Sequence, residues 1–215
     1  MTLQVLPPRY YALIPAAGSG HRLRGPVAKP YMALSGKPLL WHTLTALAQV
    51  EALEKIYVLL ARDDDVWSQT EWAGLTARVE VLMCGGATRA DTVRNALDAL
   101  KDNLHPEDWI LVHDAARACI TADLITRLIT QVGDDACGGL LACRMADTVK
   151  RSDGHKRVEA TVARDDLWQA QTPQMFRFAM LHNALHQCSD VSDEAGAIET
   201  LGLSLIHISE PTRPY

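Results

Sequence analysis

The sequence has few aromatic residues, about 6% of 215, and no apolar run approaches the ~20 residues that a membrane-spanning helix needs. It also lacks an excess of positive charge. Lysine and arginine total 21 against 26 acidic residues, and a formal net charge of -5 gives no general attraction to nucleic acid. Nor does the N-terminus show the pattern of a signal peptide. We therefore expect a cytoplasmic protein that binds neither membranes nor nucleic acid.

The five cysteines are scattered, odd in number and without a CxxC pair. This distribution argues against a disulfide framework and against a zinc site, so buried thiols are expected. His182 and His186 stand four residues apart on a probable helix. Without the glutamate of an HExxH motif they indicate a polar helix face, and the sequence assigns them no role.

The chain is ordinary in overall composition, with 48% hydrophobic and 22% charged residues, and its length suits one domain. Apolar and β-branched runs alternate with segments of helical periodicity, which predicts an α/β fold: a Rossmann-like, mostly parallel sheet with helices on both faces. The runs expected to be strands cover residues 10–16, 55–61, 78–84, 108–115 and 138–145. The segments expected to be helices cover residues 38–50, 88–101, 121–132, 177–188 and 193–202, with Thr121 as an N-cap.

Residues 147–163 break this alternation. They form two polar runs around a Ser-Asp-Gly turn and contain too few large apolar side chains to join a core. The pattern predicts a projecting β-hairpin arm.

The loop after the first predicted strand contains Gly18 and Gly20, followed by Arg22 and Lys29 with no acidic residue between them. Glycines let backbone N–H groups approach an anion closely, and the cations would neutralise a triphosphate. The loop is neither a Walker A motif nor a dinucleotide fingerprint. A plain strand-to-helix turn and a solvated basic loop remain the alternatives.

Asp114 lies at the carboxyl end of the predicted strand over residues 108–115, next to two alanines and close to Arg117. A carboxylate at the carboxyl end of a strand can hold Mg²⁺, whose other ligands would be phosphate oxygens and water. It can equally serve as a helix N-cap or as the ionic partner of Arg117. The sequence leaves these readings open.

Six segments in order along the chain carry a family resemblance. They are PAAGSGHRLRGPVAKPY, GGATRADTVRNAL, ILVHDAAR, DTVKR, QTPQMF and SDEAGAIE. As a set they resemble the 2-C-methyl-D-erythritol 4-phosphate cytidylyltransferases of the non-mevalonate isoprenoid pathway, whereas a glycine loop alone marks many nucleotidyltransferases. The resemblance places the nucleotidyltransferase domain at residues 1–202.

The resemblance implies a reaction of CTP with methylerythritol phosphate, with Mg²⁺ as cofactor, in a homodimer whose arm reaches the partner's site. It implies nucleotide contacts from Ala16, Ala17, Gly18, Gly20, Gly86 and Thr92, and catalytic contacts with the phosphates from Arg22 and Lys29. It further implies substrate contacts from Arg117, Thr148, Arg164 and Thr172, and a metal contact from Asp114.

Three departures from the family pattern accompany this resemblance. Ala87 replaces a common aspartate, and Pro30 follows Lys29 where the family usually has glutamine. Residues 203–215 replace the family's last strand, its substrate-contacting lysine and its closing helix, and they read as translated foreign sequence, although they are apolar enough for a short strand. Two alternatives therefore stand beside the main reading: a ribitol-5-phosphate cytidylyltransferase, and a catalytically impaired CTP-binding protein.

Overall fold

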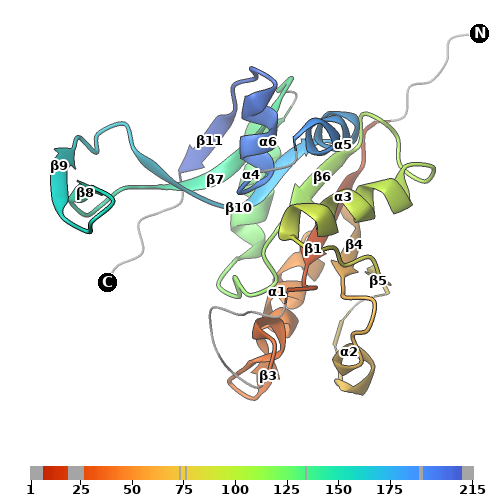
Figure 1. Ribbon diagram of the computed structural model, residues 1–215. Coiled ribbons are helices and arrows are strands. Elements are labelled where there is room, and N and C mark those ends of the chain that lie inside the picture. The colour runs from red at the N-terminus through yellow and green to blue at the C-terminus, as the bar shows by residue number, and fades with distance from the viewer. Residues whose placement is uncertain are drawn as a thin grey trace, which may run out of the picture.

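The computed structural model describes residues 7–18, 27–72, 74–75, 77–133, 135–188 and 191–209. Its centre is a seven-stranded sheet of order β11-β7-β10-β6-β1-β4-β5 (Figure 1). The strands of this sheet are β1 (Tyr10–Pro15), β4 (Leu53–Leu59), β5 (Val79–Leu82), β6 (Trp109–Val112), β7 (Gly138–Arg144), β10 (Trp168–Arg177) and β11 (Ile206–Ser209). The helices are α1 (Leu39–Ala48), α2 (Val66–Gln69), α3 (Arg89–Leu100), α4 (Ala122–Val132), α5 (Phe178–Gln187) and α6 (Glu194–Thr200).

The sheet is mostly parallel, as predicted. Strand β1 pairs in parallel with β4 and β6, β4 with β5, and β7 with β11. Strand β10 alone runs against its neighbours β6 and β7. The predicted α/β class is thus confirmed, and the carboxyl ends of β1, β4, β5 and β6 lie along one edge.

Two hydrophobic layers cover the two faces of the sheet. Alternate residues of β1 point to opposite layers. Ala12 and Ile14 pack in the layer that contains Leu44, whereas Tyr11 and Leu13 pack in the other. Helices α1 and α4 supply the first layer, and α3, α5 and α6 supply the second. The residues on each face of β1 are buried, and for this reason the sequence of the strand is a continuous apolar run.

The sequence did not reveal β10 as a strand. The segment is polar over Gln169–Gln171 and contains Pro173, which lacks the N–H that a sheet ladder needs. The pairing of β10 with β7 is irregular between Ala170 and Gln174, so the sheet accommodates the proline at a break in register. The short elements η2 (Lys29–Tyr31), β2 (Ala33–Leu34), β3 (Lys37–Pro38) and α2 were likewise not predicted.

The predicted hairpin is present as β8 (Val149–Ser152) and β9 (Val158–Val162), an antiparallel pair that projects from the body of the protein (Figure 1). Asp153 closes its turn, because Oδ1 accepts hydrogen bonds from the backbone N–H groups of His155 and Arg157, each at 2.8 Å. Val158 is 66% exposed, which is unusual for a large apolar residue.

The C-terminal segment adds the edge strand β11, as its apolar residues allowed. Ile208 pairs with Leu141 of β7 and is buried, while Ile206 is exposed. Residues 210–215, with Pro211 and Pro214, lie outside the described part of the chain.

All five cysteines are free, but the expectation that they are buried is wrong. Cys119 is exposed, and Cys84, Cys137, Cys143 and Cys188 are partly exposed. Four of them lie outside helices and strands, and Cys143 lies next to the last residue of β7. Within the described residues, no helix combines the length and the apolar character required to cross a bilayer.

Candidate active site

The edge formed by the carboxyl ends of the parallel strands holds most of the predicted site residues. After β1 the chain continues through Ala16, whose N–H donates to the carbonyl of Leu59 at 2.9 Å, and then through Ala17 and Gly18. Ala16 is buried at the base of this loop. Gly20 and Arg22, which were predicted to complete it, lie outside the described residues.

Gly85 brings the loop after β5 against the loop after β1. A Cβ atom added at Gly85 would lie 2.7 Å from the Cβ of Ala17 and 2.8 Å from the Cα of Ala61. Such distances are too short for any side chain, so only glycine permits this packing. The Gly85 N–H also donates to the carbonyl of Leu60 at 2.8 Å. Two loops of the predicted nucleotide site are therefore held side by side.

Gly86 and Thr92 are joined directly. The Thr92 hydroxyl lies 3.0 Å from the Gly86 N–H, from which it accepts, and it donates to the carbonyl of Thr88 at 3.0 Å. Thr92 is only 3% exposed. The buried Thr92 side chain therefore fixes the backbone of the loop at Gly86. Thr88 is the N-cap of α3 and forms a reciprocal capping box with Asp91.

Asp114 lies at the centre of a network of charged side chains. Its Oδ1 accepts from Nε of Arg89 at 2.9 Å, and its Oδ2 accepts from Nε of Arg117 at 2.8 Å. Arg117 also donates to the side-chain oxygen of Gln171 on β10. The reading of Asp114 as an ionic partner of Arg117 is thus supported, with Arg89 as a second partner.

The charges in this network stabilise one another. Burial alone would raise the pKa of Asp114, but the guanidinium groups of Arg89 and Arg117 outweigh it and hold the pKa below its usual value. Burial acts to lower the pKa of Arg89, yet the carboxylates of Glu194 and Asp114 raise it overall. Asp114 and Arg89 are therefore ionised at neutral pH. Complete burial raises the pKa of Glu194, although its contact with Arg89 opposes that shift.

His113 and Thr172 are hydrogen-bonded to each other and lie beside this network. The carbonyl of Arg117 can only accept, so Nε2 of His113 donates to it at 3.3 Å and Nδ1 accepts from the Thr172 hydroxyl at 3.0 Å. The Thr172 oxygen in turn accepts from the Asp114 N–H at 3.2 Å. Burial lowers the pKa of His113 to about 4, so the ring is neutral and fixed in one tautomer.

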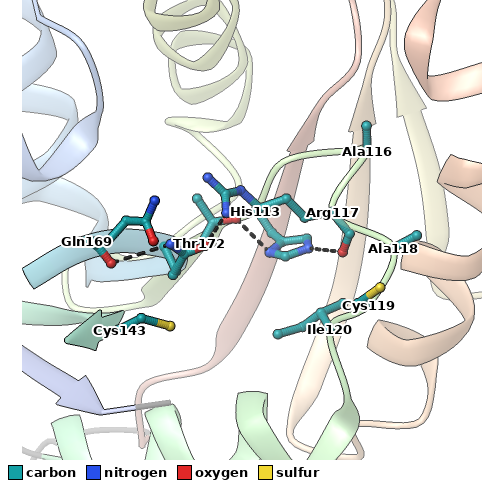
Figure 2. A pocket seen from close by; sticks show the side chains of 10 residues that line it. His113, Ala116, Arg117, Ala118, Cys119, Ile120, Cys143, Gln169 and Thr172 are labelled. Atoms are coloured by element: carbon teal, nitrogen blue, oxygen red, sulfur yellow. Dashed lines mark hydrogen bonds between the residues drawn. The ribbon is translucent and has the colours of Figure 1, made fainter. Parts of the chain in front are cut away.

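These residues open onto a cavity of about 350 Å³ (Figure 2). Its lining includes Arg117 and Thr172, two residues predicted to contact the substrate, together with Gln171 and the thiols of Cys119 and Cys143. The cavity is large enough for a small phosphorylated polyol.

Thr148 and Arg164 are not among the residues that line this cavity. Thr148 precedes β8 and Arg164 follows β9, so both lie at the base of the arm. Arg164 donates there to the carbonyl of Ala146. The structure of a single chain therefore brings together Arg117 and Thr172 but leaves the other two predicted substrate contacts elsewhere.

Lys29 is the first residue of η2, and its side chain is exposed. The adjacent Tyr31 is buried and donates its hydroxyl to Asp64 at 2.8 Å, which holds this turn against the loop after β4. The proline that departs from the family pattern, Pro30, is buried within the same turn. Lys29 is thus an accessible cation on a fixed backbone.

The donor set at Asp114 fits a divalent ion only in part. Each carboxylate oxygen already accepts one guanidinium N–H, so a metal ion would have to share an oxygen or displace an arginine. Among the described residues, no cluster of three His, Cys, Asp or Glu ligands includes Asp114. Mg²⁺ fits here only if phosphate oxygens and water provide most of its ligands, which is its usual mode of binding.

Two residues of the network were missed by sequence reasoning, namely Arg89 and Glu194. Both occur inside segments that carry the resemblance, but a charged residue in a helix normally indicates a solvated face. The side chain of Glu194 is instead completely buried. Neither residue has a local pattern that signals its partner.

Comparisons with known proteins identify the family of the chain. The family model described as "IspD: 2-C-methyl-D-erythritol 4-phosphate cytidylyltransferase" matches residues 10–210. Relatives with that name from Thiobacillus denitrificans and Dechloromonas aromatica are 51% identical over 200 residues and 50% identical over 196 residues; each alignment covers 91% of this chain and 86% of the relative.

Solved structures show the same fold. A crystal structure of 4-diphosphocytidyl-2C-methyl-D-erythritol synthase matches with a TM-score of 0.83 and 38% identity, covering 96% of this chain and 91% of the other. The Francisella tularensis 2-C-methyl-D-erythritol 4-phosphate cytidylyltransferase matches with a TM-score of 0.78 and 34% identity, covering 94% and 90%. The chain belongs to the 2-C-methyl-D-erythritol 4-phosphate cytidylyltransferase family.

Proposed function

We propose that this protein transfers the cytidylyl group of CTP to 2-C-methyl-D-erythritol 4-phosphate in non-mevalonate isoprenoid synthesis. A phosphate oxygen of the methylerythritol phosphate attacks the α-phosphorus of CTP. The bond from this phosphorus to the bridging oxygen breaks, and pyrophosphate leaves with the electron pair. The family match over residues 10–210, together with the cavity beside Arg117, carries the proposal. The names of the relatives do not favour ribitol phosphate as the acceptor.

The attacking oxygen is already anionic, so the reaction needs no general base. What it needs is a surface that holds two anions in line and stabilises the charge that develops between them. Arg117 faces the cavity with its Nε fixed by Asp114, which leaves its remaining N–H groups in a defined direction. We assign Arg117 and Thr172 to the acceptor phosphate and polyol.

The nucleotide would lie over the loops after β1 and β5. We assign its contacts to Ala16, Ala17, Gly18, Gly20 and Gly86, with Thr92 holding the second loop in shape. Arg22 and Lys29 would neutralise the triphosphate. The mutual packing of Gly85 and Ala17 supports this assignment, because it places the two loops at one position on the sheet edge.

Members of this family are nucleotidyltransferases that generally use a divalent metal ion, and we propose Mg²⁺ for this chain. The ion would enter with the triphosphate and share Asp114 with its arginine partners. When bound, it supplies positive charge to the α-phosphoryl group and the leaving group. The protein side chains orient the reactants around it.

We propose that the arm over residues 147–163 makes a homodimer and carries Thr148 and Arg164 into the partner's site. Two observations support this proposal. A two-stranded ribbon is marginally stable alone, and the exposed Val158 offers an apolar contact to a second chain.

The reactants are water-soluble phosphates, and we therefore propose that the reaction takes place in the cytoplasm.

We further propose that residues 203–215 are not the family's own ending. The strand β11 fills an edge position, but residues 203–209 contain no lysine to replace the substrate-contacting cation. We expect the changed ending to weaken binding of the acceptor more than binding of CTP. Exchanging residues 203–215 for a family-like ending should raise turnover, and equal activity and stability of the two chains would contradict this proposal.

A pyrophosphate-release assay tests the proposed function. We expect release only when CTP, methylerythritol phosphate and Mg²⁺ are all present, and none with ribitol 5-phosphate as acceptor. CTP binding without release would support the impaired alternative. Release with ribitol 5-phosphate at a comparable rate would contradict the acceptor assignment.

A further inference from the structure

A second group of potential ligands lies outside the candidate active site, where α5 packs on α3. It consists of Asp98 on α3 and of His182 and His186, which are one helical turn apart on α5. Nε2 of His182 lies 2.8 Å from Oδ1 of Asp98, and Nε2 of His186 lies 2.9 Å from the same oxygen. Two imidazoles from one helix and one carboxylate from another therefore converge on a single point.

We propose that Asp98, His182 and His186 form a binding site for a divalent transition-metal ion of the zinc type. Two imidazole nitrogens and a carboxylate are a common three-ligand set for such ions, with the remaining position taken by water. This site is independent of the proposed cytidylyl transfer.

The distances between the ligand atoms suit such an ion. Tetrahedral zinc with bonds of about 2.0–2.2 Å places its ligand atoms roughly 3.3 Å apart. The three potential ligand atoms of the cluster all lie within 4.8 Å of one another, and the two nitrogen-to-oxygen distances are 2.8 and 2.9 Å. An ion would need to lengthen the two nitrogen-to-oxygen distances by only a few tenths of an ångström, which surface side chains can do by small rotations.

The surroundings favour binding in two ways. The side chains of His182, His186 and Asp98 are 29%, 43% and 43% exposed, so an ion can enter and keep a water ligand. Phe178, one turn before His182, stacks on its ring with centroids 5.7 Å apart. This contact limits the rotation of the imidazole and reduces the entropy lost when it coordinates an ion.

The choice of ion follows from the ligand types. Imidazole nitrogen suits zinc, nickel, cobalt and copper, whereas Mg²⁺ prefers a shell of oxygen atoms. The Mg²⁺ proposed for the reaction should therefore not occupy this site.

A bound zinc ion would cross-link α3 to α5. Helix α3 begins at Arg89, beside the candidate active site. Asp98 is nine residues further along, roughly 14 Å down the helix axis, so the ion would stabilise the fold without touching the reactants.

Calorimetric titration of the purified, metal-free full chain with zinc chloride tests the proposal. We expect a specific site that is lost in the double variant H182Q/H186Q. In H182Q, H186Q and D98A we expect the affinity to fall on the order of tenfold or more. At a free zinc concentration one hundred times the Kd, we expect Tm to rise by about 5 to 10 °C, and Mg²⁺ should give no such rise through this site.

Two controls separate this site from other potential ligands. H155Q removes an exposed imidazole from the turn of the arm, and C119S removes the exposed thiol. Both should leave the zinc affinity unchanged. Comparing Tm and circular dichroism of each variant without metal shows whether it is folded before its affinity is compared.

Three results would overturn the proposal. The first is an unmodified chain that takes up no zinc at micromolar concentrations. The second is a folded H182Q/H186Q variant that keeps the full affinity and stoichiometry. The third is a D98A variant that binds zinc as tightly as the unmodified chain, which would remove Asp98 from the site.

Discussion

Arg89 and Glu194 are separated by 105 positions in the sequence, yet Nη1 of Arg89 lies 2.7 and 2.8 Å from the two carboxylate oxygens of Glu194. Glu194 is fully buried at the start of α6, and Arg89 is the first residue of α3. Because Arg89 also holds Asp114, the pair connects two helices to the residue that orients Arg117. The position of Arg117 in the candidate active site therefore depends on the buried ion pair between Arg89 and Glu194.

The first prediction concerns this buried pair. Arg89→Met leaves the Glu194 carboxylate buried without a counter-charge, and we expect the free energy of unfolding to fall by about 3–5 kcal/mol. Arg94→Met, on the same helix but paired at the surface with Asp91, should cost about 1 kcal/mol or less. Urea denaturation measures both.

The double variant R89M/E194M provides the decisive comparison. Removing both charges should be less destabilising than Arg89→Met alone, because no ion is left unpaired. If the double variant is as unstable as the sum of the two single variants, the pair is not coupled as the structure indicates.

The second prediction concerns Asp114. Asp114→Asn keeps the shape but removes the charge that fixes Arg117, and we expect kcat/KM for methylerythritol phosphate to fall roughly tenfold to a hundredfold. Steady-state kinetics at saturating CTP measures this change. Asp123→Asn, an exposed substitution in the first turn of α4, serves as the control and should have no effect. Unaltered kinetics in Asp114→Asn would remove Asp114 from the site.

The third prediction concerns Lys29. Replacing it with alanine removes an exposed cation that the proposed function places on the triphosphate, and turnover should fall roughly a hundredfold. Lys101→Ala, at an exposed position just after α3, controls for the general loss of positive charge. Near-normal turnover in Lys29→Ala would contradict its assigned role.

The fourth prediction concerns pH. Because burial depresses the pKa of His113 from 6.5 to about 4, its contribution to stability is present above pH 6.5 and is lost as the pH falls towards 4. By pH 5 the linkage gives a loss of about 2 kcal/mol in the free energy of unfolding. Urea denaturation at pH 7.5 and pH 5 measures it, and His113→Gln should show a smaller loss over this interval. An equal pH dependence in both proteins would argue against a neutral, buried His113.

The fifth prediction concerns the arm. If β8 and β9 join two chains, the protein should sediment as a dimer at micromolar concentration. Val158→Asp places a charge on the exposed apolar position of the arm and should shift the equilibrium towards the monomer. Val158→Thr keeps the β-branched shape and should remain closer to the dimer. A monomeric unmodified chain would exclude the arm as a dimer contact.

The sequence by itself determined the fold class and the sheet edge along which most residues of the candidate site lie. Runs such as Tyr10–Pro15 and Trp109–Val112 are apolar on both faces of a strand, and they alternate with helices, so a covered parallel sheet follows from burial alone. The loops after these strands then had to meet at one edge. The hairpin was also predictable, since its polar residues and Ser-Asp-Gly turn are local features.

Only the tertiary structure decided the features that depend on distant partners. The strand β10 contains Pro173 and polar residues, and it enters the sheet because β6 and β7 on either side supply its hydrogen bonds. Glu194 is buried because Arg89 meets it, and Asp98 faces His182 because α5 packs on α3. Such contacts join residues far apart in the sequence and follow from packing, for which local composition and periodicity carry no signal.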